Sequence, residues 1–392
     1  MRVYSPATLL LTAVVAMSFL GLGFVMPLRS LYASDMGASG AEVGLMASAF
    51  MLSGLLAAPT VGRLSDQVGH ARLLWVWLAL HSVLVLLYLP VQSPVGLIGL
   101  RALEGIAVAC AMPPARALMV RLVPPGRQGE GAALISNARA AGILLGPAVG
   151  AFLAAWLGYT PSFLLASACL ALAALVAGVV LGRHTSSAGT ATRAEITPAR
   201  WTRPLALACG LGLVLALPQG LGAALWAIYM RDRGASLELI GLSFTVFAIL
   251  PLIVAPLTGR WSDRHGRRLP LLIGLVALAL VYSLYAAPIG ALAILAVSFV
   301  EGAPSSLARS AADGLIADVS PRGGEGRAQA RFTAAQNAGS LIGATAGGVL
   351  YELSSGAPFA LLAGVYLVSA LLLLTPALAR LFSRPALAYP VA

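Results

Sequence analysis

Long apolar stretches constrain the fold of this chain more than any other feature. Charged residues, prolines and glycines divide its 392 residues into twelve stretches, each with the ~20 mostly apolar residues that a spanning helix needs. The strands of a membrane barrel alternate in polarity and are about half as long. We therefore expect an all-α polytopic membrane protein with transmembrane helices at 7–29, 42–61, 73–91, 95–118, 131–157, 160–181, 204–229, 238–257, 269–287, 291–316, 329–351 and 357–379.

The composition excludes several classes of function. Hydrophobic residues make up 59% of the chain and charged residues only 10%, against about 25% charged residues in a soluble protein. All 25 basic residues are arginine, so the lysine of a phosphate-binding GxxxxGK[ST] loop is missing and a P-loop ATPase is excluded. HExxH, GxSxG and GxGxxG are missing too. We expect no enzyme activity, no cofactor and no metal, and an energy source that is a gradient or a partner.

The arginines predict the orientation in the membrane. They lie mainly in short loops between apolar stretches, so membrane topology explains the net charge of +11 better than nucleic-acid binding does. With a cytoplasmic N-terminus, eighteen arginines lie on the cytoplasmic side and only Arg29, Arg231 and Arg233 on the other. The positive-inside rule then predicts that both termini are cytoplasmic.

The two halves of the chain repeat one another. A shift of 197 residues aligns them without a gap over more than a hundred residues, and it pairs Tyr32 with Tyr229, Gly69 with Gly266, Glu104 with Glu301 and Gly142 with Gly339. The long polar connector at 183–203 predicts a cytoplasmic linker between six-helix bundles at 1–182 and 204–392. Because the number of helices per repeat is even, the bundles are parallel, and a substrate site is expected between them near the midplane.

One motif occurs in matching loops of both halves. Residues 62–72 read GRLSDQVGHAR, and residues 259–268 read GRWSDRHGRR. Both resemble the GxLaDrxGrk signature of the major facilitator superfamily (MFS), although Gln67 and His70 stand where that family usually has basic residues. The resemblance covers nearly the whole chain and implies the MFS fold.

The resemblance implies that these loops form a conformational gate that latches the outward-facing state. Its expected members are Gly62, Asp66, Gly69 and Arg72 in the first copy and Gly259, Asp263, Arg264, Gly266 and Arg267 in the second. Gly62 and Gly69 allow tight turns, and the aspartates accept bonds from arginines or from a helix N-terminus. Asp313 is a further candidate that joins Arg264 or Arg267. The alternative is a topology anchor without gating.

Glu104 and Glu301 are the most informative pair of residues. Each lies about ten residues past the outer start of its helix, which is ~15 Å along the helix and near the midplane of a ~30 Å core. A carboxylate at that depth is costly unless it is paired, faces water or is protonated. Glu104 either couples to a proton or forms a static pair with Arg101 or Arg139. Glu301 has no nearby arginine in the sequence, so it is the better candidate for a titrating or substrate-contacting group.

Other residues inside the predicted helices are candidates for the cavity or for packing. The element at 100–105 is similar to the family's RxxqG element, which makes Arg101 a proton-relay or helix-locking residue. Substrate-cavity candidates are Arg139, Asn137, Gln219, Gln336 and Asn337, for which interhelical contact is the alternative. Gly142, Gly146, Pro147 and Gly150 match the GxxxGPxxG element of the family's drug/proton antiporters, and plain helix packing explains them equally well.

These observations predict a proton-coupled secondary transporter that exports drugs or small amphiphilic solutes by alternating access. Its partners would be a small-molecule substrate, protons and the bilayer, with no nucleic acid, and the resemblance implies a monomer. The alternative is an exporter, flippase or facilitator of anionic or zwitterionic amphiphiles, and a non-transporting receptor is a remote one. The arginine-only usage and the short loops suggest a bacterial inner membrane.

Overall fold

The computed structural model describes residues 5–124, 126–179, 201–320 and 324–376, and all regular structure in these ranges is helical. The helices are α1 (Pro6–Asp35), α2 (Gly40–Val68), α3 (His70–Leu86), α4 (Pro94–Ala109), α5 (Met112–Leu122), α6 (Gln128–Leu157), α7 (Tyr159–Val179), α8 (Arg203–Asp232), α9 (Leu237–His265), α10 (Arg268–Ala286), α11 (Ala291–Val319), α12 (Glu325–Leu353) and α13 (Ala357–Leu374). The expected all-α fold is confirmed, and most of the expected linker at 183–203 lies outside the described residues.

Thirteen helical segments correspond to the twelve expected helices, because α4 and α5 form one apolar span, Pro94–Leu122. The interruption falls at Cys110 and Ala111, directly before a Pro113-Pro114 pair in the first turn of α5. Proline lacks the amide hydrogen of a continuing helix and clashes with the preceding turn. In the described ranges, ten spans are long and apolar enough to cross a membrane.

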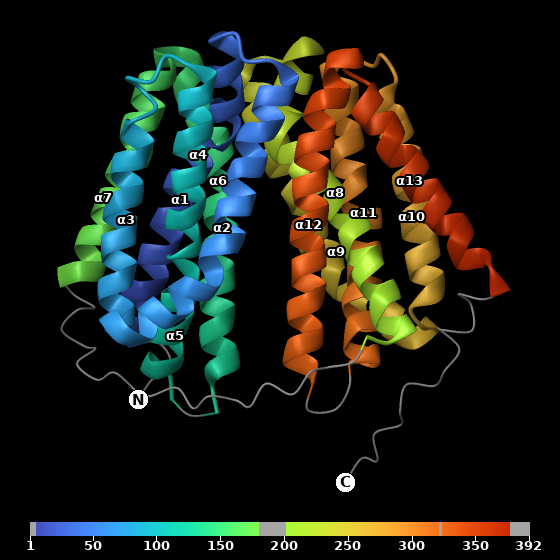
Figure 1. Cartoon of the computed structure of the whole chain (residues 1–392), viewed down its shortest axis with the longest axis horizontal. Helices are drawn as coiled ribbons and strands as arrows, with labels where there is room; N and C mark the ends of the chain where they lie inside the picture. Colours follow the sequence, from blue (N-terminus) through green and yellow to red (C-terminus); the bar gives the residue numbers. More distant parts are fainter. Residues whose placement is uncertain (1–4, 125, 180–200, 321–323, 377–392) are drawn as a thin grey trace. The chain divides into compact units, whose positions relative to one another are not determined.

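The described helices cluster into two compact units. One unit comprises α1 to α7 together with residues 226–231 and 235–245, and the other comprises the remaining parts of α8 and α9 with α10 to α13. In the first unit, α1 packs against α6 and α7, α2 against α4, and α3 against α7 (Figure 1). In the second unit, α10 packs against both α11 and α13.

Rows of glycine bring helix backbones into direct contact in both units. On α6, a Cβ added at Gly142 would lie 2.6 Å from the backbone nitrogen of Leu20 on α1, and one added at Gly146 would lie 2.6 Å from Gly23 Cα. A side chain at Gly150 would overlap the backbone of Phe24. The equivalent row of α12, Gly339, Gly343 and Gly347, faces Leu213, Leu217 and Leu221 of α8. The packing expected of these rows is therefore present in both halves.

Candidate functional site

Glu104 lies at the centre of a buried polar network in the first unit. Its side chain is fully buried on α4. Its carboxylate accepts hydrogen bonds from Arg29 Nη2 of α1 at 2.6 Å and from Arg101 Nη1 at 3.0 Å. Tyr88 donates its hydroxyl at 2.7 Å, and His81 Nε2 of α3 lies 3.4 Å away. Helices α1, α3 and α4, together with Tyr88 just after α3, therefore meet at one carboxylate.

Two guanidinium groups against one carboxylate hold Glu104 as a fixed charge. A buried ion needs an opposite charge and hydrogen bonds to offset its desolvation, and Glu104 receives both. Arg101 also lies over the ring of Phe50, 4.1 Å from its centroid, which restrains its position. The geometry favours the static pair with Arg101 among our alternatives. Arg29, which we counted as an outer-side arginine, is a buried residue of α1. Its ion pair with Glu104 is shorter than that of Arg101.

Glu301 occupies the equivalent position of the second unit in different surroundings. It is 4% exposed on α11, and its carboxylate accepts hydrogen bonds from Tyr282 and Tyr285 of α10, both at 2.9 Å. The ring of Tyr366 on α13 packs 5.4 Å from that of Tyr282, and Phe359 lies 5.7 Å from Tyr285 between ring centroids. Among the described residues, no basic side chain forms an ion pair with Glu301. Its hydrogen-bond donors are all neutral hydroxyl groups.

The repeat explains this difference residue by residue. Tyr88 and Tyr285 are equivalent, and each donates a hydrogen bond to its glutamate. The three basic residues of the first network have apolar or neutral counterparts: Trp226 for Arg29, Leu278 for His81 and Ser298 for Arg101. The second unit adds Tyr282, whose counterpart is Val85. The same arrangement of helices therefore holds a carboxylate paired with arginines in one half and a carboxylate hydrogen-bonded to tyrosine hydroxyls in the other.

Arg309 is a site residue that we did not anticipate. It lies eight residues after Glu301 on α11 and is half-buried. With the amide of Gln219 oriented so that its oxygen faces the guanidinium, this oxygen accepts hydrogen bonds from both Arg309 Nη1 and Nη2. The signal in the sequence is an arginine inside an apolar span, which is a functional hypothesis by default. We overlooked it because its counterpart in the first half is the apolar Met112.

The remaining cavity candidates do not join either glutamate. Asn137 and Arg139 are exposed on α6, outside its glycine row. The guanidinium of Arg139 lies over the ring of Phe19 at 6.0 Å from the centroid and forms no ion pair with Glu104. On α12, Gln336 is half-buried and Asn337 is exposed. Of the five candidates, only Gln219 is brought to a charged residue.

The glycines of the expected gate loops differ in conformation: Gly62, which we expected to allow a tight turn, lies within α2, whereas Gly69 and Gly266 directly follow the ends of α2 and α9. Gly69 and Gly266 have φ values of +95° and +77°, a conformation that glycine adopts without strain. In the second loop, Arg267 binds Asp263 and donates to Ser262 Oγ at 3.3 Å. Its Nε also donates to Asp318 Oδ2 of α11 at 2.8 Å, and this contact raises the pKa of Arg267.

Two details of the gate differ from our expectation. Asp318, at the end of α11, makes the contact with Arg267 that we assigned to Asp313, and Arg264 is exposed on α9 without an ion pair to either aspartate. Asp318 is about one and a half helical turns beyond Asp313, where the end of the helix reaches the loop. Gly259 lies within α9.

The first gate loop is built from other groups. Ser65 Oγ and His70 Nδ1 are 2.7 Å apart, and both residues are buried. His70 is the counterpart of Arg267, and Arg121 is the counterpart of Asp318. Arg72 is exposed. The side chain of Asp66 lies outside the described residues.

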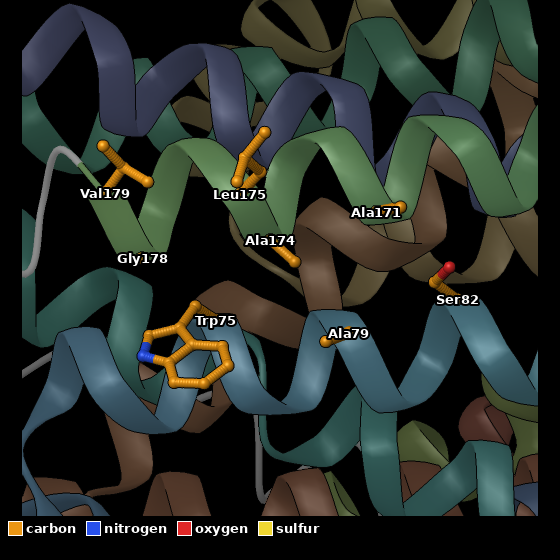
Figure 2. Close-up of a pocket in the computed structure, with 8 residues that line it drawn as sticks. All are labelled: Trp75, Ala79, Ser82, Ala171, Ala174, Leu175, Gly178 and Val179. Atoms are coloured by element: carbon orange, nitrogen blue, oxygen red, sulfur yellow. The ribbon is translucent and has the colours of Figure 1, made fainter.

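A groove between α3 and α7 is separate from these polar sites. Figure 2 shows its lining side chains, which are Trp75, Ala79, Ser82, Ala171, Ala174, Leu175, Gly178 and Val179. Its volume is about 510 Å³. None of the candidate residues for transport lines it, and most of its lining residues are apolar.

Repeated sets of membrane-spanning helices, each with a buried carboxylate at matching positions, are typical of secondary transporters. The sequence matches the model of the Major Facilitator Superfamily over residues 8–219 and 207–386. The chain belongs to this superfamily and is a membrane-spanning transporter.

Similar proteins agree with this assignment. An uncharacterized MFS-type transporter of Methanocaldococcus jannaschii is 24% identical over 344 residues, which is 86% of this chain and 89% of the relative. The quinolone resistance protein NorA of Staphylococcus aureus is 27% identical over 219 residues, which is 55% of this chain and 56% of NorA.

Solved structures show the same fold. The nucleoside transporter NupG has a TM-score of 0.77 at 14% identity, covering 97% of this chain and 100% of that chain. A bacterial homologue of the human lysosomal transporter Spinster, in an inward-facing conformation, has a TM-score of 0.67 at 16% identity, covering 96% of this chain and 95% of that chain.

Proposed function

We propose that this protein is a proton-coupled secondary transporter that exports small amphiphilic solutes, including drugs, in exchange for protons. The observation that carries the proposal is Glu301: a buried carboxyl group on a membrane-spanning helix whose hydrogen-bond partners are two tyrosine hydroxyls. An ionised carboxylate that lacks a cationic partner is energetically costly in an apolar medium. Protonation removes the charge and therefore this cost.

The tyrosines suit both protonation states of Glu301. A hydroxyl group is a donor to the ionised carboxylate and an acceptor from the protonated one. Tyr282 and Tyr285 therefore retain a hydrogen bond before and after proton transfer. Glu104 lacks this freedom because Arg29 and Arg101 would each be left with a buried charge if it were protonated. We assign the moving proton to Glu301 and a fixed structural charge to Glu104.

One relative supports the export of small amphiphilic solutes. NorA is named for quinolone resistance, a property that fits export of small amphiphilic compounds. The excess of arginine on one side of the membrane supports a bacterial inner membrane with both termini in the cytoplasm. We further propose that the protein functions as a monomer, as two gate loops and both glutamates are present in one chain.

Transport in proteoliposomes tests the proposal. The purified protein would be reconstituted with a pH-sensitive dye inside the vesicles, and a pH gradient would be imposed before lipophilic cations, anions and zwitterions are added. We expect a solute to dissipate the gradient with wild type and with Arg116→Gln, an exposed-arginine control. Glu301→Gln should abolish the exchange while it still binds the solute, although more weakly because the negative charge is lost. Equal solute flux with and without a gradient, unchanged in Glu301→Gln, would rule out proton coupling.

A second candidate function is the facilitated export or flipping of anionic or zwitterionic amphiphiles. The observation that favours it is the presence of several arginines within the helices of the first unit: Arg29, Arg101 and Arg139 lie on α1, α4 and α6, where Glu104 is the buried carboxylate. The same vesicles separate the two functions. A flippase would move a labelled lysolipid between leaflets without any pH change inside the vesicle.

A further inference from the structure

Arg309 has an unusual partner for an arginine within a membrane span. Its two terminal nitrogens donate to the amide oxygen of Gln219, a neutral group. Glu301 and Asp313 lie eight residues before and four residues after it on the same helix, yet Arg309 forms no ion pair with any described residue. Charged side chains at this depth usually pair with an opposite charge. Here one guanidinium has a hydrogen-bond partner but no counter-ion in contact.

The guanidinium is also accessible. Arg309 is half-buried, and the side chain of Gln219 is exposed within its unit. This contrasts with Arg29, which is buried against Glu104 and has no room for a further ligand. A guanidinium offers five donors in a planar fork that matches the oxygens of a carboxylate, sulfonate or phosphate. The amide oxygen of Gln219 uses two of these donors and is readily exchanged for a charged acceptor.

We propose that Arg309, assisted by Gln219, binds an acidic group of the transported solute, which is a zwitterionic amphiphile. This inference rests on the proposed function and adds the class of substrate to it. Glu301 and Arg309 are eight residues apart, which places them ~12 Å apart along α11. When Glu301 has released its proton, its negative charge attracts the basic group of the solute, while the acidic group binds Arg309.

The arrangement is compatible with exchange for protons. The basic group of the solute and the proton both respond to the same charge on Glu301, so they compete. The acidic group of the solute adds binding affinity at Arg309, away from the carboxylate of Glu301 where the proton binds. A solute with a basic group alone would leave Arg309 without a counter-ion, and a solute with an acidic group alone would be repelled by ionised Glu301.

Equilibrium binding to a matched set of compounds tests the inference. The set shares one aromatic amine scaffold, chosen so that its methyl ester binds wild type measurably; the free acid is the zwitterion, and the ester is the cation. Dissociation constants would be measured by calorimetry in nanodiscs at one fixed pH. We expect the zwitterion to bind wild type at least about tenfold more tightly than the ester, the effect of one charge-assisted hydrogen bond.

Two variants remove this preference by different routes. Arg309→Gln removes the charge, and we expect it to bind the zwitterion no more tightly than the ester, with the affinity for the ester within about twofold of wild type. Gln219→Glu retains Arg309 but places a carboxylate against it, so the preference should again be lost, even if Arg309→Gln fails to fold. Arg116→Gln, an exposed arginine of the first unit, should keep the preference.

Several outcomes would overturn the assignment. If wild type binds the two compounds equally, it has no subsite for the acidic group of the solute. A preference that survives in Gln219→Glu, or an equal loss of affinity for both compounds in Arg309→Gln, would give Arg309 a structural role only. Because binding is measured without a gradient, this test does not depend on proton exchange. A confirmed preference together with no proton exchange in vesicles would retain the subsite and refute the antiporter.

Discussion

Glu104 and Glu301 are the same residue at the same place in a repeat, yet their surroundings differ in charge. Glu104 is held by Arg29 and Arg101, whereas Glu301 is held by the hydroxyls of Tyr282 and Tyr285. The helices that carry them, and one tyrosine of each pair, are equivalent. The comparison teaches that a duplicated scaffold can surround one carboxylate with cations and its copy with neutral hydroxyl groups by exchanging a few neighbours.

The strongest way to break the comparison is to give the second unit the arginine of the first. Ser298 is the buried counterpart of Arg101, three residues before the glutamate. In Ser298→Arg, an adjacent guanidinium should favour the ionised carboxylate of Glu301 by ten- to a thousandfold. We expect proton-coupled flux in proteoliposomes to fall by about a hundredfold. Ser298→Met, of similar length but uncharged, is the control that should retain most of the flux.

Size-exclusion chromatography and solute binding must first establish that Ser298→Arg is folded. A folded variant that still dissipates the pH gradient at the wild-type rate would contradict the role of Glu301 as the proton carrier.

The second prediction concerns stability rather than transport. Glu104→Gln leaves two buried arginines without their counter-charge, which should destabilise the protein by about 3–5 kcal/mol. Glu301→Gln removes no ion pair and should change stability by no more than about 1 kcal/mol, since an amide can accept from the same hydroxyls. The stability of wild type and of each variant would be measured by thermal unfolding in the same detergent. A larger loss of stability in Glu301→Gln than in Glu104→Gln would reverse our assignment.

The equivalent tyrosines provide a smaller and more selective test. Tyr285 donates to Glu301 at 2.9 Å and Tyr88 donates to Glu104 at 2.7 Å. A donated hydrogen bond favours the charged carboxylate, so Tyr285→Phe should make Glu301 retain its proton to higher pH. We expect the pH of half-maximal transport to rise by about one unit. Tyr88→Phe should leave that pH unchanged, because the arginines dominate around Glu104. A shift in Tyr88→Phe alone would indicate that Glu104 titrates.

The gate loops should show the smallest effect. The ion pair of Arg267 with Asp318 is partly exposed, so it contributes about 0.2–1 kcal/mol. Asp318→Asn should shift the balance of transport conformations by about two- to fivefold, as measured by distances between spin labels. The equivalent position in the first half holds Arg121, and Arg121→Gln should shift that balance less. The reverse order would place the principal latch in the first loop.

Much of the fold followed from local sequence patterns. Apolar runs of sufficient length located the twelve helices, and the 197-residue register related the two halves and located Glu104 and Glu301. The interruption between α4 and α5 was the main departure, although the Pro113-Pro114 pair was its visible cause.

The partners of the site residues were less accessible to sequence reasoning. Arg29 is the last residue of the first predicted helix and was counted on the outer side by its charge alone, but α1 continues to Asp35 and Arg29 is buried. Asp318 and Arg309 have counterparts of different character, Arg121 and Met112, so the repeat gave no signal for them. Contacts between helices depend on which faces meet, and a single sequence does not contain that information.

The glycine rows have a mechanical consequence. Where α6 meets α1 at Gly142, Gly146 and Gly150, backbone touches backbone, so no layer of side chains is present that can compress, tilt or exchange rotamers. We therefore expect the two helices to move as one stiff pair, and the same expectation applies to α12 and α8 at Gly339 and Gly343, which face the backbone of α8. Spin labels on α1 and α6 should keep a constant separation through the whole transport cycle.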